Sequence, residues 1–148
     1  MTITLKDEAA TAALGAAIAR GLKAGDAVLL EGELGAGKTT LARGILRALG
    51  VAEHVPSPTF TLVQAYETGG LTVRHFDLYR VTNPRELDEL GLEDALADGA
   101  VLLEWPERAA ARMPKDALEI HLTARGDARE ARISGPARWQ GLLHGLAA

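Results

Sequence analysis

The segment Gly32–Thr39 carries the residue types of a phosphate-binding loop. It reads Gly-Glu-Leu-Gly-Ala-Gly-Lys-Thr, two glycines separated by four residues and followed by Lys and a hydroxyl residue. Glycines let the backbone turn tightly and present N–H groups to phosphate oxygens. The pattern places Lys38 to reach the β- and γ-phosphates and the Thr39 hydroxyl to bind Mg2+. A glycine turn in a chain rich in Ala and Gly is the alternative, but we expect this segment to bind a nucleoside triphosphate.

Two acidic residues stand where strand-like segments end. Glu104 follows the apolar run Val101–Leu103, and Asp77 lies in the β-like segment Arg74–Arg80. A carboxylate at the end of a strand, facing the crevice above a sheet, can hold Mg2+ directly or through its waters. Triphosphate hydrolysis needs such a carboxylate and a group that positions water. Either acid could instead cap a helix or pair with an arginine, and their division of roles stays open.

The segment Ser57-Pro58-Thr59 is a candidate switch. It lies a short loop after the helix expected behind the phosphate-binding loop. Many nucleotide hydrolases place a residue there that senses the γ-phosphate and Mg2+. The alternative is a turn hydroxyl that satisfies its own backbone. Thr59 is therefore a candidate for the catalytic machinery.

Three neighbours of the two acids allow two interpretations each. His75 lies two residues before Asp77, on the same strand face, so it could orient that carboxylate or be a hydrogen-bonded core histidine. Trp105 could pack in the core or form a contact surface. Arg80 could stabilise charge or be a solvated strand end.

The elements around the loop must form an anion site. Asp26–Glu31 reads as a short apolar strand, and Thr40–Leu49 reads as a helix with apolar residues at helical spacing, stopped by Gly50. A strand, a glycine loop and a helix N-terminus together favour phosphate through free N–H groups and the helix dipole.

The remaining segments predict an α/β layer sandwich around a mixed sheet, similar to phosphate-loop NTPases. Expected strands are Thr2–Leu5, Thr59–Tyr66, Leu71–Tyr79, Ala100–Glu104, Leu118–Thr123 and Ala128–Ser134. The turn Glu67–Gly70 is too short for a crossover, so the strands on either side of it should pair antiparallel. Expected helices run from Asp7 to about Leu22, from Asn83-Pro84 to an interruption at Gly91, over Leu92–Leu96, and from Pro136 onward; Pro106–Pro114 is helical or irregular.

Length and composition limit the function classes. The 148 residues suit one domain, 1–148, and the absence of Cys excludes disulfides and thiolate metal sites. The N-terminus lacks a secretory signal pattern, and no apolar stretch approaches 18 residues, so we expect a cytoplasmic protein without membrane attachment. A net charge of −4 argues against a protein that grips nucleic acid alone.

Four motifs in order carry a resemblance to a known family. They are Gly32–Thr40, Ser57–Val63, His75–Arg80 and Glu104–Pro106. They resemble the bacterial TsaE (YjeE) family of small ATPases, which is required for threonylcarbamoyl modification of adenosine 37 in tRNAs reading codons that begin with A. The resemblance extends from the N-terminal helix to the strand near Arg132. Glu33 stands where Asp is common in the family, a small departure in a loop that acts through its backbone.

The resemblance implies a Mg2+-ATP site assembled from several parts of the chain. The phosphates are held by Gly35, Ala36, Gly37, Lys38, Thr39 and Thr40. Thr39 and Glu104 bind Mg2+, Thr59 belongs to a mobile switch-like loop, and Asp77 is an acid of the active site. Lys38, Asp77, Glu104 and Thr59 are the candidate catalytic residues. Further candidates for the surroundings of the nucleotide are Glu8, Thr11, Arg80 and Arg129.

The resemblance also implies partners. Members of the family act with the TsaD and TsaB proteins, which perform the carbamoyl transfer, and use ATP to permit turnover of that pair. tRNA would then be met only through the complex. Two other functions remain in view: a small-metabolite kinase and a nucleotide-gated binding module with negligible hydrolysis. A kinase needs a lid with several arginines, and the region Arg108–Arg112 offers a thin candidate.

Overall fold

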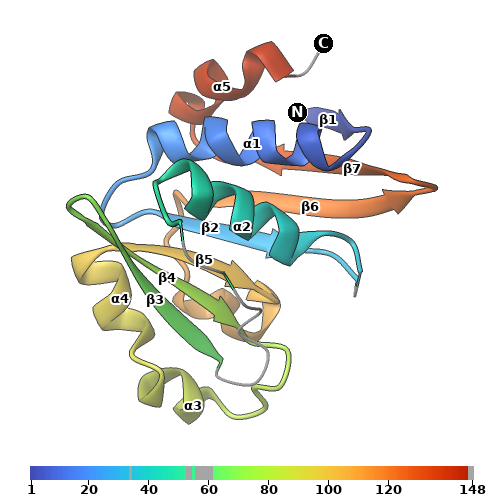
Figure 1. The fold of residues 1–148 in the computed structure, drawn as a ribbon. Coiled ribbons are helices and arrows are strands. Elements are labelled where there is room, and N and C mark those ends of the chain that lie inside the picture. Colours follow the sequence, from blue (N-terminus) through green and yellow to red (C-terminus); the bar gives the residue numbers. More distant parts are fainter. Residues whose placement is uncertain (34, 53–54, 56–61, 147–148) are drawn as a thin grey trace.

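One mixed sheet forms the centre of the molecule (Figure 1). The computed structural model describes residues 1–33, 35–52, 55 and 62–146. Within these residues seven strands pair in the order β1-β7-β6-β2-β5-β4-β3. Their bounds are β1 Thr2–Leu5, β2 Ala27–Glu31, β3 Val63–Thr68, β4 Leu71–Asp77, β5 Ala100–Glu104, β6 Leu118–Arg125 and β7 Ala128–Ser134.

The sheet has a parallel centre and antiparallel edges, as predicted. β6, β2, β5 and β4 run parallel, whereas β3, β7 and β1 pair antiparallel with their neighbours. β2 and β5 both read Ala-Val-Leu-Leu-Glu, and every apolar residue of the two strands is buried. Continuous apolar runs are typical of parallel strands that are covered on both faces.

Helices cover both faces of the sheet (Figure 1). Side chains alternate along β2, so that Val28 and Leu30 belong to one core cluster while Ala27 and Leu29 belong to another. The first cluster is closed by α1 (Glu8–Gly21), α2 (Lys38–Ala48) and α5 (Ala137–Leu143). The second is closed by α3 (Pro84–Glu89), α4 (Leu92–Asp98) and the 3-10 segment η1 (Pro106–Arg112). A short 3-10 segment, η2 (His144–Leu146), follows α5.

A glycine sets the distance between α1 and α2. A Cβ on Gly15 would lie 2.8 Å from the backbone C of Gly44 and from the backbone N of Ile45. Because backbone atoms cannot move aside as a flexible side chain can, only glycine fits at this crossing. At the N-terminal end of α1, the Asp7 side chain caps the helix by accepting a hydrogen bond from the Ala10 N–H at 2.9 Å.

The observed elements depart from the predicted bounds at several ends. α2 begins at Lys38 rather than Thr40, and β6 continues to Arg125. β3 extends to Thr68, because Gly69 and Gly70 both take positive φ and close a two-residue hairpin loop. The predicted start of β3 at Thr59 lies outside the described residues.

β4 ends at Asp77, two residues before its predicted end. The backbone changes course there: the Leu78 N–H donates to the carbonyl of Glu104 at 3.1 Å, and the Tyr79 N–H donates to the Asp77 carboxylate at 3.0 Å.

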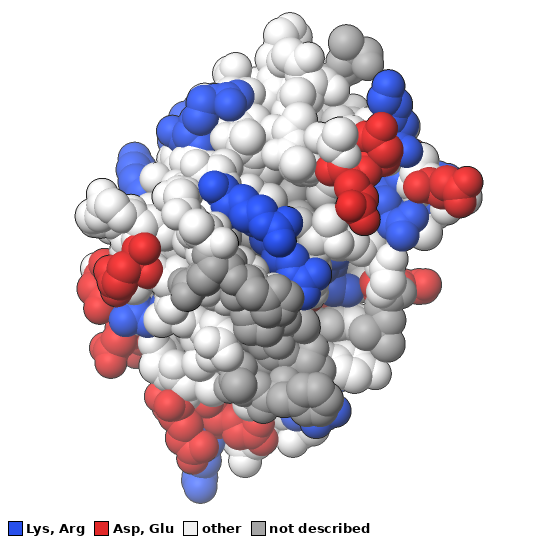
Figure 2. Space-filling view, in the orientation of Figure 1, with Lys and Arg blue, Asp and Glu red and all other residues white. Residues whose placement is uncertain are grey.

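Charged side chains of both signs are mixed on the face that carries α1 and α2. Over the described residues of that face, Figure 2 shows Lys and Arg interspersed with Asp and Glu rather than gathered into one continuous basic surface. None of the helices in the described part of the chain combines the length and the apolar character that crossing a membrane requires.

Candidate functional site

The glycine loop joins the end of β2 to the start of α2. Gly32, Gly35 and Gly37 have φ values of 142°, 81° and 103°, in the region that favours glycine. At Gly32 space is restricted as well, since a Cβ there would lie 2.5 Å from the carbonyl oxygen of Leu122. Gly37 is the N-cap of α2, so the first N–H groups of this helix have no acceptor within the helix and lie at the loop. The backbone thus has the form of an anion site.

Lys38 is buried inside this loop. Its Nζ donates to the carbonyl of Gly32 and, at 3.0 Å, to the carbonyl of Glu33. It also lies 4.2 Å from the centre of the Trp105 ring, a cation–π distance. Burial lowers the pKa of Lys38 from its ordinary value, and the negative charges of nearby carboxylates, Glu104 first, offset part of that effect.

Glu104 and Thr39 meet beside Lys38. The Thr39 Oγ1 donates to the Glu104 carboxylate, 3.0 Å from both Oε1 and Oε2. The contact arises because β2 and β5 pair in parallel with Leu30 opposite Glu104, which sets the end of β5 next to the start of the loop. The Glu104 side chain is buried. A hydroxyl and a carboxylate at this position are oxygen donors of the kind that Mg2+ prefers.

Asp77 stands beside Glu104 at the same edge of the sheet. The two residues are opposite one another in the β4–β5 register, and both are buried. The carboxyl ends of parallel strands meet at one edge, where α/β proteins bind their ligands. The two acids selected from the sequence are therefore brought together beside the loop. The described residues contain no group of three or more His, Cys, Asp or Glu able to hold a metal, so Mg2+ here would also need the Thr39 hydroxyl and phosphate oxygens.

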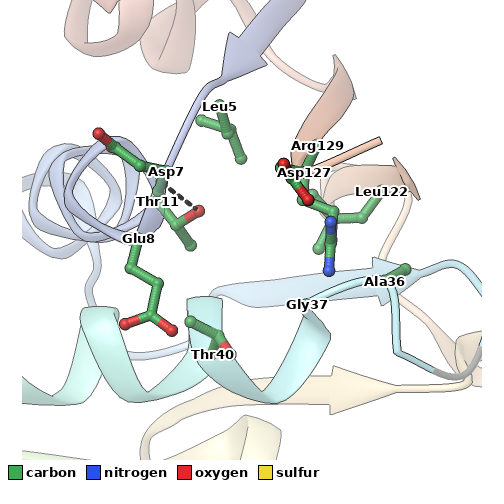
Figure 3. A pocket seen from close by; sticks show the side chains of 10 residues that line it. All are labelled: Leu5, Asp7, Glu8, Thr11, Ala36, Gly37, Thr40, Leu122, Asp127 and Arg129. Carbon is green, nitrogen blue, oxygen red and sulfur yellow. Dashed lines mark hydrogen bonds between the residues drawn. The ribbon is translucent and has the colours of Figure 1, made fainter. Parts of the chain in front are cut away.

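A pocket of about 180 Å³ opens on the other side of the loop (Figure 3). The loop and the start of α2 form one wall, the start of α1 forms the second, and the β6–β7 hairpin forms the third. Its lining residues are Leu5, Asp7, Glu8, Thr11, Ala36, Gly37, Thr40, Leu122, Asp127 and Arg129. The Arg129 guanidinium crosses toward Gly37 and donates to the Gly35 carbonyl at 3.2 Å. Glu8 and Thr11 of α1 thus share one pocket with the loop and with Arg129 of β7, which lies far from them in the sequence.

Other sequence-based candidates have different surroundings. Arg80 is exposed and is not part of the pocket lining. Thr59 lies outside the described residues. His75 contacts Glu104 rather than Asp77, with its Nε2 2.6 Å from Glu104 Oε2. Although His75 and Asp77 share a strand face, the partner of His75 comes from the neighbouring strand.

Trp105, Asp7 and Asp127 lie at the site but were not assigned to it from the sequence. Trp105 contacts Lys38, and its ring centre lies 4.8 Å from that of Tyr79, which is 41% exposed. Its φ of 61° is unusual for a residue with a side chain. Asp7 and Asp127 also line the pocket, although from the sequence Asp7 was expected only at the start of the first helix and Asp127 had no assigned role. Their position depends on where β7 and α1 meet, which no local pattern encodes.

Comparison with known proteins gives one consistent result. Residues 5–133 match the family described as "Threonylcarbamoyl adenosine biosynthesis protein TsaE". The chain is 40% identical over 121 residues to the tRNA threonylcarbamoyladenosine biosynthesis protein TsaE of Rickettsia felis, covering 81% of this chain and 71% of that protein. It is 41% identical over 107 residues to the protein of the same name from Haemophilus influenzae, covering 72% of this chain and 68% of that one.

The fold comparison agrees with the sequence comparison. The crystal structure of Bacillus subtilis YdiB superposes with a TM-score of 0.77 at 31% identity, covering 99% of this chain and 93% of that one. The α/β fold with a mixed sheet, expected from the sequence, is therefore confirmed. Together with the match over residues 5–133, this result shows that the chain belongs to the TsaE family.

Proposed function

We propose that this protein is a single-domain ATPase that binds and hydrolyses Mg2+-ATP in support of tRNA threonylcarbamoyladenosine formation. The observation that carries the proposal is the contact between Thr39 and Glu104 beside the glycine loop. It places a metal-binding hydroxyl and a strand-end carboxylate together at the N-terminus of α2, where the phosphates of a nucleotide would lie. The names of the TsaE relatives support the pathway.

The loop residues would hold the triphosphate. The N–H groups of the segment from Gly35 to Thr40 would bind phosphate oxygens, and Lys38 would exchange its carbonyl partners for the β- and γ-phosphates. Thr39 and Glu104 would hold Mg2+, which when bound neutralises charge on the phosphate oxygens. Because the Glu104 carboxylate already contacts Thr39, we assign to Asp77 the task of orienting the attacking water.

The pocket beside the loop is suited to the nucleoside end of ATP. Glu8 and Thr11 face it from α1, and Arg129 faces it from β7 (Figure 3). Carboxylate and hydroxyl oxygens suit the hydroxyls of a ribose, and a guanidinium suits phosphate or a ring face. The roles of Arg80 and Thr59 stay predictions. Arg80 would lie near the nucleotide but outside this pocket, and Thr59 would belong to a switch-like segment.

We propose that the ATPase acts on the TsaB–TsaD pair and meets tRNA only through that complex. The net charge of −4 and the mixed charges of the face in Figure 2 support a protein that relies on partners for nucleic-acid binding. The kinase alternative finds little support, because Arg112, one of its candidate lid arginines, pairs with Asp88 near the end of α3.

Phosphate release tests the proposed chemistry. We expect slow release by the wild-type protein in the presence of Mg2+, and loss of that release in Lys38→Ala and in Glu104→Ala. Lys115→Ala and Glu89→Ala are matched controls, because both side chains are exposed and lie outside the site. Unchanged release in the two site variants would contradict the assignment. ATP consumption in proportion to an added alcohol or nucleoside would favour the kinase.

A further inference from the structure

A fully buried histidine contacts the metal-side carboxylate. His75 lies on β4, and Glu104 lies on β5 two residues beyond the register partner of His75, Leu102. Val73 and Leu102 belong to the core cluster under α1 and α2, so the alternation of side chains points His75 and Glu104 toward that same side. The His75 Nε2 is 2.6 Å from Glu104 Oε2, and the histidine side chain is 0% exposed.

The hydrogen-bond partners define which ring nitrogen carries hydrogen. A carboxylate can only accept, so the His75 Nε2 must donate to Glu104. The other ring nitrogen, Nδ1, is buried and has no hydrogen-bond partner among the described residues. A hydrogen on Nδ1 would be a buried donor without an acceptor, which is unfavourable. These partners assign the ring hydrogen to Nε2.

The same carboxylate receives hydrogen bonds from two directions. Oε2 accepts from His75 on one side, and Thr39 Oγ1 lies 3.0 Å from both oxygens on the other. A free glutamate side chain rotates about three bonds. The hydrogen bond from His75 restrains the carboxylate group of Glu104 against this rotation. The Thr39 hydroxyl can keep its hydrogen on Glu104 while its lone pairs face a cation.

We propose that His75 is a positioning residue for metal binding: it holds the Glu104 carboxylate in the orientation that pairs with Thr39 and faces Mg2+. The proposal rests on the Mg2+-nucleotide function proposed above. It requires that loss of the Nε2–H donor weakens metal binding by about 10- to 100-fold, as for other residues that orient a metal ligand. A histidine that only fills the core would affect stability and leave metal affinity unchanged.

Mn2+ binding to the protein–ADP complex, followed by electron paramagnetic resonance, tests this role. We expect His75→Leu to weaken Mn2+ binding about 10- to 100-fold while the affinity for ADP in EDTA stays within about twofold. His75→Gln offers an amide donor near the position of Nε2 and should recover most of the loss. Thermal unfolding of each variant identifies those that fold. Folded His75→Leu that binds Mn2+ like the wild type would overturn the proposal.

Two further measurements separate the possible failures. If the wild-type complex itself does not bind Mn2+, the proposed Mg2+ function fails, and the role of His75 fails with it. If His75→Leu does not fold, His75→Asn takes its place, because the shorter asparagine amide does not reach the position of Nε2 beside Glu104. Folded His75→Asn should bind Mn2+ more weakly than folded His75→Gln, and equal binding by the two variants would overturn the proposal. Long-range 1H–15N correlation spectra of the wild-type protein report the ring form directly. We expect the Nε2–H form for His75, and an Nδ1–H form would overturn the assignment.

Discussion

The Thr39 Oγ1 lies 3.0 Å from both carboxylate oxygens of Glu104, although 65 positions separate the two residues in the chain. Parallel pairing of β2 with β5 makes this contact, because both strands end at the edge of the sheet where the glycine loop begins. The two proposed Mg2+ ligands are thus brought together by two buried strands of the sheet.

Removal of the Thr39 hydroxyl should raise the Mg2+ concentration that nucleotide binding requires. Thr39→Val keeps the side-chain volume but deletes the oxygen that contacts Glu104. We expect the Mg2+ concentration for half-maximal nucleotide binding to rise by about 10-fold or more, whereas Thr39→Ser stays near the wild-type value. Titration of Mg2+ at fixed nucleotide measures the difference. Equal requirements in the valine and serine variants would exclude Thr39 as a ligand.

Trp105 should report on nucleotide binding. Its ring is 4.2 Å from the Lys38 Nζ, and a lysine that turns toward phosphate changes this contact. The other tryptophan, Trp139, is buried in the core cluster under α1 and α5. In Trp139→Phe, we expect ATP to change the tryptophan emission. In Trp105→Phe, the tryptophan emission should not change when ATP is added. A change in that variant would show that the signal does not come from Trp105.

At neutral pH, the buried charge of Lys38 should lower the stability of the folded protein. Burial lowers the pKa of Lys38, so the unfolded chain holds this proton more tightly than the folded chain does. Stability therefore rises as pH increases from below the folded pKa toward the ordinary value of 10.5. We expect the Tm of Lys38→Met minus that of the wild type to become smaller as the pH is raised from 7 toward 10.5. A difference that grows with pH would contradict this sign.

The α1–α2 crossing should not tolerate a methyl group. Alanine in place of glycine within a helix usually stabilises by about 0.5–1 kcal/mol. At Gly15 the added Cβ meets backbone at 2.8 Å, so we expect Gly15→Ala to destabilise by about 1–3 kcal/mol. Gly141 of α5 has open space around it, so Gly141→Ala is the matched control and should be neutral or stabilising. Urea unfolding measures the free energy of unfolding of both variants. Equal effects of the two substitutions would contradict a steric clash at Gly15.

The sequence was most informative where one local pattern encodes both structure and chemistry. The glycine loop, the apolar strands and the acids that end them follow from residue type and spacing, and all three are found near their predicted positions. Contacts between strands could not be predicted in this way, because they depend on strand order. From the sequence, His75 could orient Asp77 or be a hydrogen-bonded core histidine; it is fully buried, and the adjacent strand supplies Glu104 as its partner. The contact of Arg129 with the loop carbonyl of Gly35 has the same origin.

ATP turnover with and without the partner pair is the most direct test of the central claim. We expect slow hydrolysis by the protein alone, faster hydrolysis when the TsaB–TsaD pair is added, and none with Glu104→Gln in either case. Complementation by Glu104→Gln in cells would favour a nucleotide-gated binding module instead. Equal and rapid turnover with and without the pair would contradict a partner-dependent ATPase.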